Sequence, residues 1–324
     1  MIEDFLRGLQ TAGSIPFERF MEAALYHPEF GYYAKQVRTV GRAGDFSTWP
    51  GLHSSLARAV AAWLRSSPSK HIIEAGAGTG HLAAGVLDRL GFLRRLRTTL
   101  HIVEISPVLR AAQEKLLCGK NVMWHRDMND ALAAAAGRAN IYSNELPDAF
   151  PCRVFVRSDA LWKELALKVD GNSAREVLRD CELPESSSLQ GNPPDGTRVE
   201  VHESYRKWLA SWAGSWKCGK MLTVDYGAAM PSLYHRRPSG SLRAYAHHQR
   251  LTGADFFGSV GHRDITADVN FTDLENWGNA LGWKTVSLGA LSDFIRSQCP
   301  RIILNDQFAE AGKAFQALLQ SRCE

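Results

Sequence analysis

The sequence predicts an α/β protein built on a doubly wound, parallel sheet. From residue 70 onward, short apolar runs typical of buried strands alternate with amphipathic segments typical of helices. The first strand-to-helix junction, residues 72–81, carries three glycines at alternate positions. Because the carboxyl ends of parallel strands meet at one edge, ligands of such folds bind along that edge.

The junction reads Ile-Ile-Glu-Ala-Gly-Ala-Gly-Thr-Gly-His. Glycines permit positive φ and close approach of a ligand, and free N–H groups at a helix start attract anionic groups. The spacing differs from the dinucleotide and phosphate-loop patterns, and no lysine follows it. It suits a ligand without a pyrophosphate, such as S-adenosylmethionine (SAM); an ordinary glycine-rich turn is the alternative. The predicted cofactor contacts here are Glu74, Gly76, Gly78 and Gly80.

Residues 100–105 predict the next strand, with Glu104 near its carboxyl end. A carboxylate in this position can accept hydrogen bonds from both ribose hydroxyls. The alternative is an acid favoured by the dipole of the following helix, for which Ser106 is a plausible N-cap and Pro107 a first residue.

Further strands are expected at 121–125 and 140–145, with a short helix at 131–136 between them. The carboxyl-edge rule then places four polar residues along one rim: Glu74, Glu104, Asn144 and Glu145.

The part before this alternation is expected to be helical over residues 1–35 and again over 52–64. The first segment ends in an aromatic turn at 26–33. A glycine-rich loop at 41–50, which carries an acid and an aromatic residue, separates it from the second segment. Such a loop can close over a ligand, or it can be a simple connector.

The second half interrupts the alternation. Residues 157–200 indicate an insertion or edge hairpin, and 201–216 predict a helix whose tryptophan stripe packs in the core. A strand at 220–227 precedes a loop at 228–262, which we interpret as a lid on the substrate side. A helix at 271–281, a strand at 283–288 and helices over the last thirty residues complete the chain. The expected parts are a helical cap at 1–69, a Rossmann-like half at 70–156, an insertion at 157–216 and the remainder at 217–324.

Composition narrows the class of protein. A net charge of +4 over 324 residues is mild and does not favour nucleic-acid binding. The six cysteines are far apart without a C-x-x-C, which argues against a zinc site or a disulfide framework. No metal site is expected. No secretory signal is recognised, and no apolar run approaches the ~20 residues of a membrane helix. We therefore expect a soluble, cytoplasmic protein.

Several stretches, taken in order, match one family. They are residues 25–33, 44–50, 74–80, 103–107, 144–151, 225–227, 240–243 and 264–267. Over roughly residues 17–290 the chain resembles the MidA-like methyltransferases, the group that contains the mitochondrial complex I assembly-factor arginine methyltransferase and its bacterial relatives. The resemblance implies a class I SAM-dependent methyltransferase fold with N-terminal helical elements and a lid.

The resemblance also implies roles for residues. Gly76, Gly78 and Gly80 would cradle SAM, and Glu104 would hold its ribose. The loop with Gly44, Asp45, Phe46 and Thr48 would cover the cofactor, and Asn144 and Glu145 would face the methyl group. The chain departs from the family pattern at three places. The family usually has Phe-Gly-Glu around Ser55, where this chain does not, and histidine where this chain has Asp268. The family also often has Thr-Gln in the stretch that corresponds to 291–295, and this chain lacks it. These departures leave the substrate open.

An arginine acceptor needs carboxylates that grip its planar guanidinium. Glu145, Asp148 and Asp264 are the candidates, although Asp148 could instead cap a turn. His247 and His248 could act as a base for another acceptor, or be solvated residues of the lid.

Three functions follow: a protein arginine methyltransferase, a small-molecule O- or N-methyltransferase, and a SAM-binding assembly factor without catalysis. An acidic groove near Glu145 favours the first. A closed apolar pocket near Tyr32, Trp49 and Tyr245 favours the second, and a cradle filled by side chains favours the third.

Overall fold

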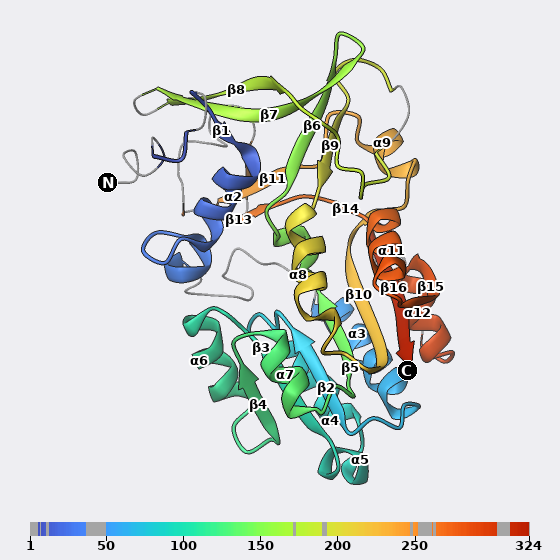
Figure 1. Ribbon diagram of the computed structural model, residues 1–324. Coiled ribbons are helices and arrows are strands. Elements are labelled where there is room, and N and C mark those ends of the chain that lie inside the picture. Colours follow the sequence, from blue (N-terminus) through green and yellow to red (C-terminus); the bar gives the residue numbers. More distant parts are fainter. Residues whose placement is uncertain are drawn as a thin grey trace.

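A computed structural model describes residues 6, 8–10, 13–36, 50–170, 173–189, 193–246, 249–251, 261, 264–302 and 312–323. Two expectations fall outside these ranges: the cofactor-covering loop with Gly44, Asp45, Phe46 and Thr48, and the pair His247 and His248. Figure 1 shows a lower part built on the large sheet and an upper part built on a second sheet.

The large sheet has eight strands and confirms the predicted alternation. Its order is β15-β16-β10-β5-β2-β3-β4, with β14 beside β10. The strands are β2 (His71–Ala75), β3 (Thr99–Val103), β4 (Val122–His125), β5 (Asn140–Asn144), β10 (Cys218–Ala228), β14 (Val269–Asn270), β15 (Lys284–Ala290) and β16 (Phe315–Cys323). The inner pairs from β10 to β4 are parallel, and β16 runs antiparallel to both neighbours.

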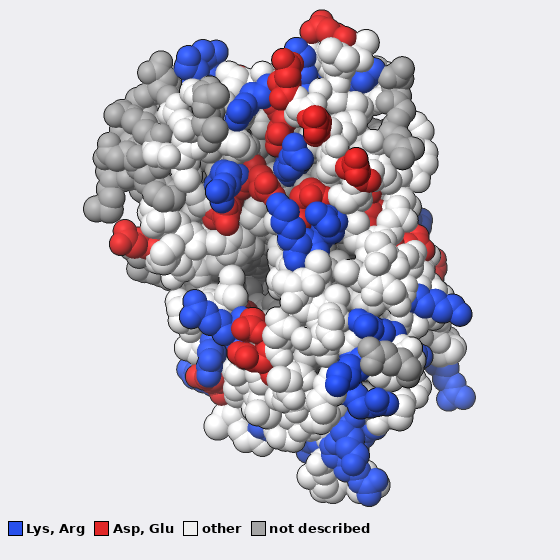
Figure 2. Space-filling view, viewed as in Figure 1, with Lys and Arg blue, Asp and Glu red and all other residues white. Residues whose placement is uncertain are grey.

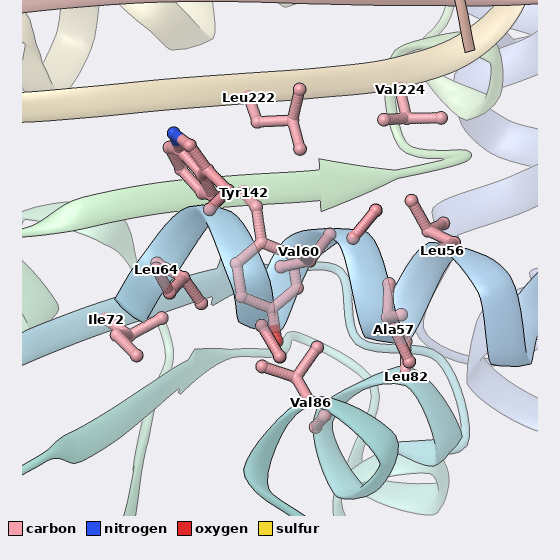
Figure 3. Packing of buried hydrophobic residues seen from close by; sticks show 14 of the residues in the cluster. Leu56, Ala57, Val60, Leu64, Ile72, Leu82, Val86, Tyr142, Leu222 and Val224 are labelled. Atoms are coloured by element: carbon pink, nitrogen blue, oxygen red, sulfur yellow. The ribbon is translucent and has the colours of Figure 1, made fainter. Parts of the chain in front are cut away.

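Helices cover both faces of this sheet. The bounds are α3 (Pro50–Arg65), α4 (His81–Arg89), α5 (Phe92–Leu96), α6 (Pro107–Leu116), α7 (Met128–Ala134), α8 (Glu203–Ala213), α11 (Phe271–Ala280) and α12 (Leu291–Gln298). Side chains that alternate along a strand point to opposite faces. Accordingly Ile72 packs with α3 and α4, whereas Ile73 packs with α7, α8 and α11. Figure 3 shows the first cluster, with Leu56 and Val60 of α3 and Val86 of α4 around Tyr142.

The tryptophan stripe packs in the core, as expected, but the helix is shorter than 201–216: Trp208 and Trp212 lie on α8, and Trp216 follows its end. Trp212 and Trp216 are fully buried, and both rings contact Trp283 at centroid distances of 5.3 and 5.2 Å. The stripe therefore fixes α8 to the sheet.

The insertion is larger than a hairpin. Strands β6 (Arg153–Ser158), β7 (Leu161–Asp170), β8 (Ser173–Asp180) and β9 (Arg198–Val201) form an antiparallel sheet, joined by β1 (Ile15–Pro16). The prediction that residues 1–35 are helical is wrong in its bounds. Helix α2 spans only Phe17–Tyr26; strand β1 precedes it, and a π-helix at Tyr32–Gln36 follows it. Packing of Phe17, Phe20 and Met21 against this sheet explains the apolar spacing that predicted the helix.

The segment 228–262 is not a plain loop. It holds α9 (Ser232–Arg236), β11 (Arg243–Ala246) and β12 (Gln249–Leu251). With β13 (Asp264–Thr266) the two strands make a small antiparallel sheet. Strands this short depend on pairing with a distant segment, which local pattern does not report.

The expectation that the last thirty residues are all helical is also wrong. After α12 the chain forms β16, which lies between β10 and β15. Its Gln-Ala-Leu-Leu-Gln core consists of good helix formers. Nine paired residues along β10 override that propensity, because they satisfy the backbone and bury both faces of the strand.

Candidate active site

The glycine turn after β2 is a preformed cradle. Gly76, Gly78 and Gly80 have φ values of +68°, +54° and +81°, a left-handed conformation that side chains disfavour. The amide of Gly76 donates to the Val103 carbonyl oxygen at 3.0 Å, which ties the turn to β3. A Cβ placed on Gly78 would meet no atom within 4 Å. The turn therefore presents open space beside its central glycine.

Glu104 lies where β3 ends and is 9% exposed. One carboxylate oxygen accepts from the Ser106 amide at 2.9 Å, and the other accepts from the Gln113 side chain at 3.1 Å. Burial raises the pKa of this carboxyl group, and the two donors lower it. The Ile105 amide is a further donor to this carboxyl group. A carboxylate has about four lone-pair sites, so it can still accept from a ribose hydroxyl.

Gln113, which was not among the predicted residues, connects two parts of the candidate site. It lies on α6 and is fully buried, together with Leu109 one turn earlier. Its Nε2 also donates to the Gly78 carbonyl oxygen at 2.7 Å, and its Oε1 accepts from Trp124 Nε1 at 3.1 Å. Gln113 thus fastens the glycine turn to Glu104. A polar residue spaced i, i+4 from a core leucine was the available signal.

Glu74 is more enclosed than a rim residue. Its side chain is 2% exposed and accepts a hydrogen bond from the Tyr142 hydroxyl at 2.6 Å. Burial raises its pKa to about 8, against the effect of that hydrogen bond. Contact of Glu74 with the cofactor stays a prediction.

Glu145 and Asp148 follow β5 on the same edge. Glu145 has φ of +52°, and Nδ2 of the Asn144 side chain donates to its Oε1 at 3.0 Å. Such strained backbone is concentrated at functional sites. Asp148 sits in a short 3₁₀ turn, where its amide donates to Asp225 at 3.1 Å. Burial raises the pKa of Glu145 to about 8 and that of Asp148 to about 7.

The fold brings Asp264 to the same place from β13. Its carboxylate is buried and accepts a hydrogen bond from the Tyr33 hydroxyl at 3.1 Å. The charges of Asp148 and Asp264 both raise the pKa of Glu145, which places the three predicted acceptor carboxylates together.

Arg243 counterbalances these acids. Its Nη2 lies 2.6 Å from Asp268, and Arg237 contacts the other oxygen of Asp268 at 2.8 Å. The Arg243 guanidinium also lies over the Tyr226 ring, 5.2 Å from its centroid. Asp268, which stands where the family usually has histidine, is therefore an ion-pair partner of two arginines. From the sequence, Arg243 was distinguished only as the last residue of the stretch 240–243.

The aromatic turn joins the two halves of the site. The Ser106 hydroxyl donates to the Tyr33 carbonyl oxygen at 2.8 Å, and the rings of Tyr26 and Tyr33 stack at 5.4 Å. Burial raises the pKa of the Tyr26 hydroxyl, and the charges of Asp264, Asp148 and Glu104 raise it further. Figure 2 shows a hollow between the parts built on the two sheets, with acidic and basic side chains gathered above it.

Comparison with known proteins agrees with this geometry. Residues 55–288 match the model of a family described as "Putative S-adenosyl-L-methionine-dependent methyltransferase". The chain belongs to this family. A solved structure from Burkholderia thailandensis, titled a likely methyl transferase bound to S-adenosyl-homocysteine, has a TM-score of 0.80 at 26% identity, over 99% of this chain and 90% of that one.

Curated relatives include animal proteins. The "Protein arginine methyltransferase NDUFAF7 homolog, mitochondrial" of Drosophila melanogaster is 29% identical to this chain over 300 residues. The "Protein arginine methyltransferase NDUFAF7, mitochondrial" of Danio rerio is 25% identical over 319 residues. The matches cover 81% and 87% of this chain. The chain spans 66% of the fly protein and 72% of the fish protein.

The class I methyltransferase fold predicted for this family member is confirmed, and its residues fit SAM. The cradle leaves space beside Gly78, and the donors on Glu104 leave room for a ribose hydroxyl to donate to it. Within the part of the chain that the structure describes, no helix is long and apolar enough to cross a membrane.

Proposed function

We propose that the protein transfers a methyl group from SAM to the guanidinium of an arginine residue in a partner protein. Two observations support this. The animal relatives are named protein arginine methyltransferases. Glu145, Asp148 and Asp264 gather at the edge of the sheet next to the cradle. A cytoplasmic location stays a prediction, because those relatives are named mitochondrial.

SAM would supply an electrophilic methyl group on a sulfonium, and the chain would position it. The backbone of Gly76, Gly78 and Gly80 would line the methionine part and ribose. Glu104, oriented by Gln113, would accept from the ribose hydroxyls. Fixing both reactants in line replaces a bimolecular encounter by a unimolecular step, which is the main contribution that positioning makes.

The carboxylates would grip the acceptor. A guanidinium presents a planar fork of donors that matches carboxylate oxygens, and Asp268 already binds two guanidinium groups of this chain. Glu145 would hold one nitrogen toward the methyl group and receive the proton that leaves after transfer. A pKa of about 8 suits this role, because the group can take up a proton near neutral pH.

The contact-only alternative is less well supported. A cradle filled by side chains would favour it. A Cβ at Gly78 would face open space, and side chains approach only the outer glycines, Leu146 at Gly76 and Gln113 at Gly80. The small-molecule alternative remains the competing enzyme activity, and the same assay separates it from the proposed one.

The test is a methylation assay with radiolabelled SAM and an extract of cells that lack the gene. We expect label in protein, and methylarginine after acid hydrolysis, with wild type but not with Glu145→Gln. Label confined to small molecules would overturn the arginine assignment. SAM binding without any label, in extracts from several conditions, would favour the contact-only alternative.

A further inference from the structure

Two cysteines far from the candidate active site face each other on neighbouring strands. Cys218 begins β10 and Cys323 ends β16, and their Cα atoms are direct partners in the antiparallel ladder. They are 105 residues apart in sequence, yet their Sγ atoms are 3.1 Å apart. Since a disulfide bond is about 2.0 Å long, a shift of about 1 Å would join them.

The backbone shows which kind of pair this is. The Cys218 amide donates to Gly137 at 3.2 Å, and its carbonyl oxygen accepts from the Ala139 amide at 3.1 Å. Both groups point away from β16, so Cys218 and Cys323 form a non-hydrogen-bonded pair. Cα atoms of such pairs are about 4.5 Å apart. That separation lies within the disulfide range of about 4.4–6.8 Å, so the backbone need not move.

The two thiols also differ in access. Cys323 is exposed and Cys218 is half-buried. A reagent in solution can therefore attack at Cys323, and Cys218 lies in contact to displace it. This combination of an accessible thiol and an adjacent resolving thiol is typical of redox-sensitive pairs.

We propose that Cys218 and Cys323 are a reversible redox site at which glutathione disulfide links β10 to β16. The Cys323 thiolate attacks one sulfur of glutathione disulfide and releases one glutathione. The Cys218 thiolate then attacks Cys323 Sγ and breaks the mixed disulfide, which releases the second glutathione. Two protein thiols are oxidised, one glutathione disulfide is reduced to two glutathiones, and the two thiol protons pass to solvent and the departing thiolates.

The linkage would stabilise a strand that supports the active site. At the opposite end of β16, Phe315 lies against the Tyr226 ring, with centroids 3.8 Å apart. Arg243 covers the Tyr226 ring, so β16 backs the acidic cluster. A bond that closes a long loop restricts the unfolded chain and raises the melting temperature.

The experiment treats the full chain with glutathione disulfide, quenches it with acid and measures intact mass and unreduced peptides. For wild type we expect a mass lower by two hydrogen atoms, a cross-link between the two peptides, and reversal by excess glutathione. Cys218→Ser should instead retain one glutathione on Cys323. Cys118→Ser removes another exposed cysteine and should cross-link like wild type.

The melting temperature provides a second measurement, which does not depend on whether Cys218→Ser folds correctly. The melting temperature of oxidised wild type should exceed that of the reduced protein, and Cys323→Ser should show no such difference. Wild type that carries only glutathione adducts, or cross-links that survive in Cys323→Ser, would overturn the proposal. These outcomes do not depend on methyltransferase activity.

Discussion

The Tyr33 hydroxyl donates a hydrogen bond to Asp264 across 3.1 Å, while the backbone of the same tyrosine accepts one from Ser106 at 2.8 Å. Ser106 in turn donates its amide to Glu104. Two predicted sites, the ribose carboxylate and an acceptor carboxylate, are thus joined through one residue of the aromatic turn. Residues 231 positions apart become neighbours in this way.

Substitution Tyr33→Phe should weaken acceptor binding more than cofactor binding. It removes the donor to Asp264 but leaves the backbone contact with Ser106. We expect the KM for the acceptor to rise several-fold, with an unchanged Kd for SAM measured by calorimetry. Tyr26→Phe is the comparison, because that hydroxyl donates to the Ala149 carbonyl oxygen instead. Equal effects of the two variants on acceptor KM would contradict the assignment.

Substitution Gly78→Ala should block the cradle. The added methyl group enters the open space beside the turn, and positive φ costs about 1–2 kcal/mol in stability. Gly119→Ala is a matched control, since Gly119 has φ of +75° and equally open surroundings. Both variants should lose similar stability, and only Gly78→Ala should lose SAM affinity in calorimetric titration. The larger Gly78→Val variant should bind no SAM. Wild-type SAM affinity in Gly78→Ala or Gly78→Val would show that the glycine turn does not bind the cofactor.

Substitution Gln113→Leu should reduce SAM affinity without contact between Gln113 and the ligand. It keeps the apolar volume on α6 and removes the donors to Gly78 and Glu104. We expect at least a tenfold increase in Kd, about 1.4 kcal/mol, because the turn and the carboxylate lose their common anchor. Glu114→Gln, on the exposed side of the same helix, should leave the Kd unchanged. An unaltered Kd in Gln113→Leu would show that the anchor is dispensable.

Substitution Glu145→Gln should abolish methyl transfer and leave SAM binding intact. In wild type, kcat/KM for an arginine acceptor should rise with pH through about 8, as Glu145 ionises. The amide can neither ionise nor accept the released proton, so the variant should show no activity over the same pH range. The pH profile is measured with saturating SAM. A kcat of Glu145→Gln equal to that of wild type would show that Glu145 does not take part in methyl transfer.

The raised pKa of Glu145 also predicts how stability depends on pH. Between its usual pKa of 4.5 and about 8, the folded protein keeps this proton and the unfolded chain loses it. The free energy of unfolding therefore falls as pH rises through that window. Glu145→Gln should be more stable than wild type at pH 9, relative to pH 5, by a few kcal/mol at most. Chemical denaturation at both pH values measures this difference; a parallel dependence in the two proteins would contradict it.

Much of the site was predictable from local pattern. Apolar runs that end in Glu74, Glu104 and Asn144 identified three adjacent parallel strands, and the glycine spacing identified the turn. Gln113 and Arg243 were not identified. Their roles depend on hydrogen bonds and ion pairs to distant segments, which residue type and spacing do not show.

The sequence alone determined the α/β class, the glycine turn and the polar residues at the carboxyl edge of the sheet, because strand and helix periodicity act over a few residues. Only the tertiary structure decided that the helix-prone segment Phe315–Cys323 becomes a strand, and that Asp264 joins Glu145 and Asp148. Both outcomes arise from pairing between distant segments. There, backbone hydrogen bonds and shared burial outweigh local propensity.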